Sequence, residues 1–135
     1  MNFLIDNNLP PAIARALHEL CKGEGHTVIP LRDKFSPNTS DIHWIMQLGS
    51  EGGWAVVSQD KFSKGNAERQ AFRDCGLPVF CLARQWGQAS YWSKAENLVR
   101  WWPAITQQAG LIAGGAAFKV AWRFSAPGKF EQLKI

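Results

Sequence analysis

Four short apolar runs, separated by segments with helical periodicity, constrain the fold of this chain more than any other feature of its sequence. The runs are NFLI, HTVIPL, WAVVSQ and LPVFCLA. Runs of this length with so few polar residues are typical of strands that are buried on both faces, as in a parallel sheet. Parallel strands need crossover connections, which are right-handed and place helices against the sheet. The sequence therefore predicts an α/β fold in which helices cover both faces of a mostly parallel sheet.

Proline and capping residues mark the starts of the predicted helices. Pro10 and Pro11 suit the first turn of the first helix, because a missing N–H costs nothing there. Ser40 is the predicted N-cap of a second helix within NTSDIHWIMQLGSEGG. The apolar stripe of this second helix is predicted to consist of Ile42, Ile45 and Met46.

The residues beyond 85 differ in character from the alternating part. Apolar residues at helical spacing in SYWSKAENLVRWWPAITQQAG predict a helix that covers the core rather than a platform for stacking bases. In AAFKVAWRFSAPGKFEQLKI, apolar residues alternate with basic or small ones and Pro127-Gly128 supplies a turn, which predicts a hairpin. We expect one domain over residues 1–135, with a motif-bearing core at 1–85 and a helix and hairpin extension at 86–135.

The net charge of the chain is modest and positive, +4 for 135 residues. This charge favours an anionic partner, of which nucleic acid is the commonest. No apolar stretch approaches the ~18 residues that a membrane span needs, and the first residues carry no basic leader. We therefore expect a cytoplasmic protein with no membrane partner.

Three aspartates occupy positions that a parallel sheet brings toward one edge. Asp6 ends the first strand, Asp60 directly follows the strand WAVVSQ, and Asp41 lies in the first turn of a helix, where the helix dipole favours a carboxylate. The carboxyl ends of parallel strands form the ligand edge of such a sheet. Carboxylates gathered there repel one another unless a hard divalent cation, Mg²⁺ or Mn²⁺, binds between them. Asp6, Asp41 and Asp60 are therefore candidate metal ligands and catalytic residues.

Structural roles remain open for the same residues. An aspartate after a strand is commonly a turn former or a helix cap, and Asp41 beside Ser40 could be only a capping residue. Asp33 is a supporting candidate ranked below these three aspartates, and it could instead pair with Arg32 or Lys34. Asn8, in the turn after the first strand, is a further supporting candidate.

Three motifs resemble the PIN-like nuclease domain, and especially its small bacterial toxin branch of the virulence-associated protein C type. The motifs are FLIDNNLPP, NTSDIHWI and VVSQDKF. The resemblance implies a three-layer α/β/α fold and a Mg²⁺ or Mn²⁺ site formed by Asp6, Asp41 and Asp60, with Ser58 as the hydroxyl of a Ser/Thr-x-Asp element. Family members often carry a fourth acidic residue shortly after the third, where this chain has KFSKGNAE.

The resemblance also implies an activity and partners. A cation held by the three aspartates would activate a water that cleaves RNA and leaves a 5′-phosphate. An antitoxin protein would neutralise the site, and a second copy of the chain is a further candidate partner. Basic residues that follow Asp60 could hold the RNA backbone, or they could simply form a solvated helix face. These candidate RNA-binding residues are Lys61, Lys64, Arg69 and Arg73.

Two other functions compete with the nuclease. The first is a non-catalytic PIN-like module that binds RNA or protein. The second is a phospho-acceptor receiver domain, which also places carboxylates at strand ends. A receiver domain needs an acidic pair near the first strand end and a lysine after a late strand, whereas Asp6 is followed by Asn7 and Asn8 and the late strand continues as FCLAR. We therefore rank the receiver domain below the binding module.

Overall fold

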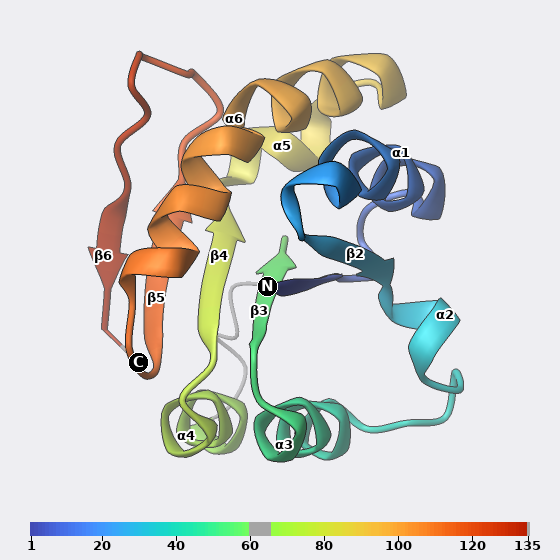
Figure 1. Ribbon diagram of the computed structural model, residues 1–135, viewed down its shortest axis with the longest axis vertical. Coiled ribbons are helices and arrows are strands. Elements are labelled where there is room, and N and C mark those ends of the chain that lie inside the picture. The colour runs from blue at the N-terminus through green and yellow to red at the C-terminus, as the bar shows by residue number, and fades with distance from the viewer. Residues whose placement is uncertain (60–65, 135) are drawn as a thin grey trace.

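The computed structural model describes residues 1–59 and 66–134 and places six strands of that part of the chain in one sheet (Figure 1). The sheet order is β2-β1-β3-β4-β5-β6, in which all neighbours are parallel except the antiparallel pair β5 and β6. The strands are β1 (Asn2–Ile5), β2 (Thr27–Pro30), β3 (Trp54–Ser58), β4 (Pro78–Leu82), β5 (Ala116–Val120) and β6 (Glu131–Leu133). The predicted α/β class with a mostly parallel sheet is confirmed.

Helices follow the strands along the chain, as the alternating pattern predicts. They are α1 (Pro11–Cys21), the 3₁₀ helix η1 (Lys22–Glu24), α2 (Leu31–Lys34), α3 (Asp41–Glu51), α4 (Asn66–Cys75), α5 (Arg84–Gln88) and α6 (Tyr91–Leu111). Pro11 opens α1, where its missing N–H has no intrahelical partner to lose. Ser40 is the N-cap of α3, and its hydroxyl accepts a hydrogen bond from the His43 N–H. Within the described residues, no helix has the length and apolar composition needed to cross a membrane.

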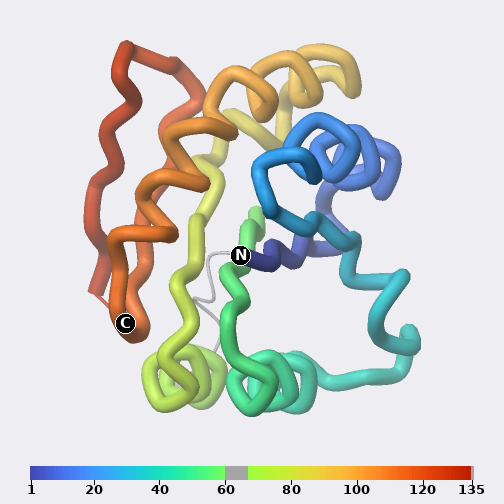
Figure 2. The backbone as a smooth tube through the Cα atoms, viewed as in Figure 1, coloured from blue at the N-terminus to red at the C-terminus, as the bar shows by residue number. Residues whose placement is uncertain are grey.

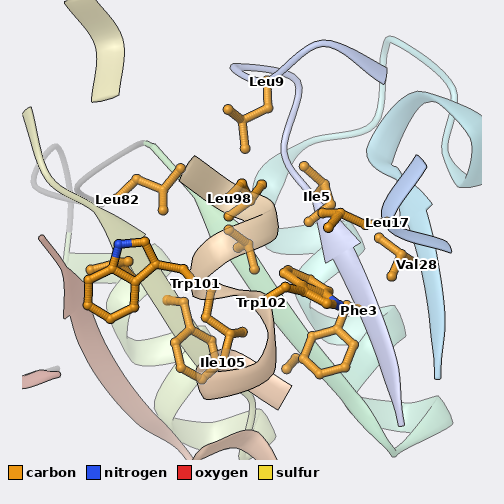
Figure 3. Close-up of a cluster of buried hydrophobic side chains, with 14 of the residues drawn as sticks. Phe3, Ile5, Leu9, Leu17, Val28, Leu82, Leu98, Trp101, Trp102 and Ile105 are labelled. Atoms are coloured by element: carbon orange, nitrogen blue, oxygen red, sulfur yellow. The ribbon is translucent and has the colours of Figure 1, made fainter. Parts of the chain in front are cut away.

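Two apolar clusters lie on opposite faces of the sheet. They join the helices on each face to the sheet, which gives the protein three layers, helix, sheet and helix. The first packs α1 and α6 against β1, β3 and β4, and Phe3, Trp101 and Trp102 lie within it (Figure 3). The second packs α3 and α4 against the other face, around Trp44 and Phe72. Successive strand residues such as Phe3 and Leu4 belong to different clusters, because side chains alternate across a sheet. Both faces of β1 and β3 are therefore buried.

The predicted apolar stripe of α3 is wrong at two of its three positions. Ile45 is buried, but Ile42 and Met46 are 39% and 58% exposed. The face that contacts the sheet instead consists of Trp44, Ile45 and Leu48. The bulky indole of Trp44 packs edge to face with Phe72 of α4, so the buried face of α3 is centred on Trp44 rather than on the predicted stripe.

The final strands belong to the central sheet rather than to an appended hairpin. β5 pairs in parallel with β4, and β6 pairs with β5 in the antiparallel sense. The predicted alternation ends at Val120, and the chain then passes through irregular backbone before β6 (Figure 2). Trp122 and Phe124 in this connection pack against the first apolar cluster. The predicted turn is present, since the Gly128 N–H donates to the Ser125 carbonyl and Gly128 has a φ of 94°.

Candidate functional site

The sheet order places a topological switch point between β1 and β3. The chain leaves β1 toward β2 on one side and returns on the other side as β3, so the connections diverge at the carboxyl ends of these strands. Ligands bind at such crevices in open α/β sheets. Asp6 directly follows β1, and its N–H donates to the Val57 carbonyl of β3 at 3.0 Å. Asp6 therefore lies at the switch point, as its position at the end of a strand predicts.

Ser58 fixes the orientation of the Asp6 carboxylate. The Ser58 hydroxyl, at the end of β3, donates to Asp6 Oδ2 at 2.5 Å. Ser58 is fully buried and Asp6 is half-buried, so this hydrogen bond joins the core to the site. A hydrogen bond to an ionised oxygen is short and strong, and it restricts the side-chain torsion of the aspartate. The structure thus brings together two of the residues that the motifs indicate.

Asp41 joins Asp6 at the same pocket. The pocket has a volume of about 470 Å³, and both carboxylate-bearing residues line it. The buried Trp44 indole donates to Asp41 Oδ1 at 3.0 Å. Because the two residues are three positions apart on α3, this hydrogen bond orients the Asp41 carboxylate within the first turn of the helix. Ser40 caps the helix, so Asp41 is not needed for that role. The remaining lining residues are Asn7, Leu31, Arg32, Phe35, Ser36, Pro37, Thr39 and Trp44.

The two carboxylates match a hard divalent cation in donor chemistry. Mg²⁺ and Mn²⁺ take oxygen ligands, and one or two carboxylates with water and substrate oxygens are sufficient to bind Mg²⁺. No group of three histidine, cysteine, aspartate or glutamate residues suited to a metal occurs in the part of the chain that the structure describes. Asp60, the third expected ligand, lies outside the described residues.

The other two supporting candidates, Asn8 and Asp33, do not line this pocket. Asn8 is exposed in the turn after β1 and does not line the pocket. Asp33 forms a two-pronged ion pair with Arg15 of α1, with the shortest N–O distance at 2.9 Å. The alternative pairing of Asp33 with Arg32 or Lys34 is therefore wrong. The packing of α1 beside β2 brings Arg15 to Asp33, and neither residue lines the pocket.

The candidate RNA-binding residues divide into three groups. Lys61 and Lys64 lie outside the described residues. Arg69 is half-buried in the first half of α4. Arg73 is exposed in the last turn of α4, which leads directly into the start of β4. Arg73 therefore lies toward the amino-terminal edge of the sheet, opposite the edge that carries Asp6.

Sequence reasoning missed Arg32 as a component of the site. Arg32 lies in α2 directly after β2 and lines the pocket beside Asp6 and Asp41. Ile5 and Pro30 are paired in the register of β1 and β2, so the residues that follow these two strands emerge at the same edge. The signal was present in the sequence, because TVIPLRDK places a cation just beyond an apolar run, as FLID places a carboxylate.

Comparison with known proteins identifies the amino-terminal part of the chain. Residues 1–84 match the family described as PIN like domain. Searches of the curated proteins and of the solved structures gave no significant match. The matched residues include β1, β3 and the whole of the Asp6 and Asp41 pocket.

Proposed function

The chain belongs to the PIN-like domain family, whose members are generally nucleases, and on this premise we propose that it is a Mg²⁺- or Mn²⁺-dependent endoribonuclease. The observation that carries the proposal is the shared pocket of Asp6 and Asp41 at the switch point of the sheet. Two carboxylates from separate elements, each oriented by a hydrogen bond from a buried side chain, line one pocket, and such oxygen ligands suit a divalent cation. A cation offsets their repulsion.

Each residue of the proposed site has its own task. Asp6 and Asp41 supply oxygen ligands, and Asp60 is the proposed third ligand. A cation held by these residues would supply the acidity that activates a water and the positive charge that stabilises the phosphate. Ser58 acts on Asp6 rather than on the substrate, because its hydroxyl is buried and already donates to that carboxylate. The expected product carries a 5′-phosphate.

We further propose that the nuclease is the toxin of a toxin–antitoxin pair of the virulence-associated protein C type. A neutralising protein would dock over the carboxylate edge and pair a basic side chain with Asp6 or Asp60. Exposed Ile42 and Met46 lie on α3, the helix that begins with Asp41, and offer apolar contacts beside the site. A second copy of the chain is another partner that such a surface would accept.

A non-catalytic PIN-like module that binds RNA or protein is the second candidate function. The segment that follows Asp60, KFSKGNAE, favours it, because it offers lysines before Glu68 where nucleases of the family often have a fourth carboxylate. Lysines in this segment would bind an RNA backbone whether or not cleavage follows. The two functions differ in whether RNA is cut.

Cleavage of RNA with and without metal tests the proposal. Wild-type protein with Mn²⁺ should fragment total RNA, and EDTA should abolish the fragmentation. Asp41→Asn should lower the rate by about 100-fold or more, because the amide cannot supply the charge that binds the cation. Asp33→Asn is the matched control, since Asp33 pairs with Arg15 outside the pocket, and it should cleave normally. Intact RNA with folded wild-type protein, or equal rates for the two variants, would contradict the proposal.

A further inference from the structure

The four residues of α2 differ in whether their side chains have a packing or ion-pair partner. Leu31 is buried in the second apolar cluster and anchors the helix to the sheet. Asp33 is held by Arg15 of α1. Lys34 forms an ion pair with Glu51 at 3.1 Å and lies 5.1 Å from the centre of the Trp54 ring. Three of the four side chains therefore have defined partners.

Lys34 pairs with a carboxylate that several donors favour in its ionised form. Hydrogen bonds from the Gln47 amide and from Lys34 lower the pKa of Glu51 below its ordinary value. Glu51 also accepts a hydrogen bond from the Trp54 indole at 2.9 Å. Glu51 is thus ionised and engaged, which keeps Lys34 on the α3 side of α2.

Arg32 is the exception among these four residues. It is exposed and makes no hydrogen bond or ion pair within residues 1–59 and 66–134, which the structure describes. Its sequence neighbour Asp33 is already occupied by Arg15. Arg32 nevertheless lines the pocket that contains Asp6 and Asp41. A guanidinium with five N–H donors therefore faces a polar pocket with its hydrogen-bonding capacity available.

The rest of the pocket wall supports an anionic ligand at this position. The hydroxyls of Ser36 and Thr39 lie 3.1 Å apart and both residues line the pocket near Arg32. Hydroxyl and guanidinium donors are the groups that contact phosphate oxygens in nucleic-acid complexes. Without metal, the two carboxylates would repel a phosphodiester, and a cationic side chain in the same pocket would offset that repulsion.

We propose that Arg32 is a phosphate-binding residue of this site, whose guanidinium holds a backbone phosphate of single-stranded RNA beside Asp6 and Asp41. The inference rests on the proposed ribonuclease function and names the residue that recruits its substrate. The planar fork of arginine matches two phosphate oxygens at once, which a lysine cannot do. The burial of Leu31 and the ion pair between Lys34 and Glu51 fix the backbone from which Arg32 extends.

Binding of RNA in the absence of metal tests this inference separately from cleavage. The probe is a fluorescein-labelled single-stranded RNA oligonucleotide, and its anisotropy is measured with the full chain in EDTA over a range of salt concentrations. Arg32→Ala should weaken binding about 10-fold at low salt and reduce the slope of log K against log salt by about 0.7, the loss of one phosphate contact. Arg32→Lys should restore the slope but only part of the affinity, because the charge remains and the fork is lost.

Arg100→Ala is the matched control, because Arg100 is an exposed arginine of α6 that pairs with Glu96 and does not line the pocket. It should bind RNA like the wild type. Wild-type protein that fails to bind the RNA, an Arg32→Ala slope equal to that of the wild type, or equal losses in Arg32→Ala and Arg100→Ala would overturn the inference. If the wild type cleaves RNA and Arg32→Ala binds RNA as tightly as the wild type, the role of Arg32 is rejected and the nuclease proposal stands. An Arg32-dependent affinity without any metal-dependent cleavage rejects the nuclease proposal alone.

Discussion

At the scale of single residues, the site depends on hydrogen bonds that orient carboxylates from the core. Asp6 accepts a hydrogen bond from the Ser58 hydroxyl, and Asp41 accepts one from the indole N–H of Trp44. Both donors are buried and both acceptors face a pocket. Metal ligands are commonly oriented by such surrounding donors, and loss of one donor changes metal affinity or activity by about 10- to 100-fold. Substitutions of Ser58 and Trp44 therefore test the proposed site as directly as substitutions of the proposed ligands.

Ser58→Ala removes the hydroxyl that orients Asp6. We expect about 1 to 3 kcal/mol lower free energy of unfolding, because a hydrogen bond to a charged group is lost at a fully buried position. RNA cleavage should also fall, by about 10-fold, as Asp6 gains torsional freedom.

Urea unfolding and cleavage rates measure the two effects of Ser58→Ala. Ser50→Ala is the control, because the Ser50 hydroxyl donates to the Gln47 carbonyl on the exposed face of α3. The control should change neither quantity appreciably. A Ser58→Ala variant with wild-type stability and cleavage would show that the hydroxyl does not orient Asp6.

Local patterns in the sequence were sufficient to place Asp6 and Asp41 at one edge of the sheet, but they did not reveal which residue pairs with Asp33. A residue at the end of an apolar run and one at the start of a helix reach the same edge in any parallel sheet, so Asp6 and Asp41 could be placed without coordinates. The partner of Asp33 could not be found in this way. Arg15 lies 18 positions earlier in the chain, and only the packing of α1 brings it to Asp33.

At the scale of elements, α3 and α4 approach each other closely at a glycine. A Cβ atom at Gly49 of α3 would lie 2.5 Å from Cys75 Cβ of α4 and 2.8 Å from its sulfur. No side chain larger than a hydrogen fits there without movement. This contact holds together the helix that begins with Asp41 and the helix that follows β3.

Gly49→Ala should therefore destabilise the protein, although alanine is the better helix former. Overpacking between the two helices should cost about 1 to 3 kcal/mol, which outweighs a helix-propensity gain of about 1 kcal/mol. Gly110→Ala in α6 is the control, because a Cβ atom there meets nothing within 4 Å. The control should stabilise by up to about 1 kcal/mol. Chemical unfolding that gives both variants the same sign would refute this account of the α3 and α4 contact.

The elements show where periodicity is informative and where it is not. Continuous apolar runs predicted β1 to β4, since strands buried on both faces have few alternatives. The stripe of α3 was misjudged, because Ile42 and Met46 are apolar without being buried, and hydrophobic residues are common on protein surfaces. The alternating pattern also did not predict where β5 ends. Trp122 and Phe124 keep the alternation of a strand, yet they reach the core from irregular backbone.

At the scale of the whole molecule, strand order determines the site. Short runs indicate how many strands to expect, but the order β2-β1-β3-β4-β5-β6 depends on long-range packing that no local pattern encodes. This order makes β1 and β3 neighbours and creates the crevice at Asp6. It also brings the start of α2 to this edge, so the sequence places Arg32 just beyond an apolar run but only the strand order shows that it reaches the pocket.

The central claim is that Asp6 and Asp41 share a pocket because they bind a cation. Without metal, two carboxylates that share a site repel each other, so Asp6→Asn and Asp41→Asn should keep or raise the free energy of unfolding. The Asn side chain still presents an oxygen to Ser58 or Trp44. If these aspartates were instead only structural, the same changes would destabilise the protein.

The most direct measurement is the shift in melting temperature that Mn²⁺ produces in the wild type, Asp41→Asn and Asp33→Asn. Binding to the folded state alone stabilises by about 2.7 kcal/mol at a metal concentration 100 times the Kd, so the wild type should melt several degrees higher. Asp33→Asn should show the same rise, because its side chain lies outside the pocket lining, and Asp41→Asn should show almost none. A wild type that does not respond to Mn²⁺, or an Asp41→Asn variant that responds fully, would contradict the cation site.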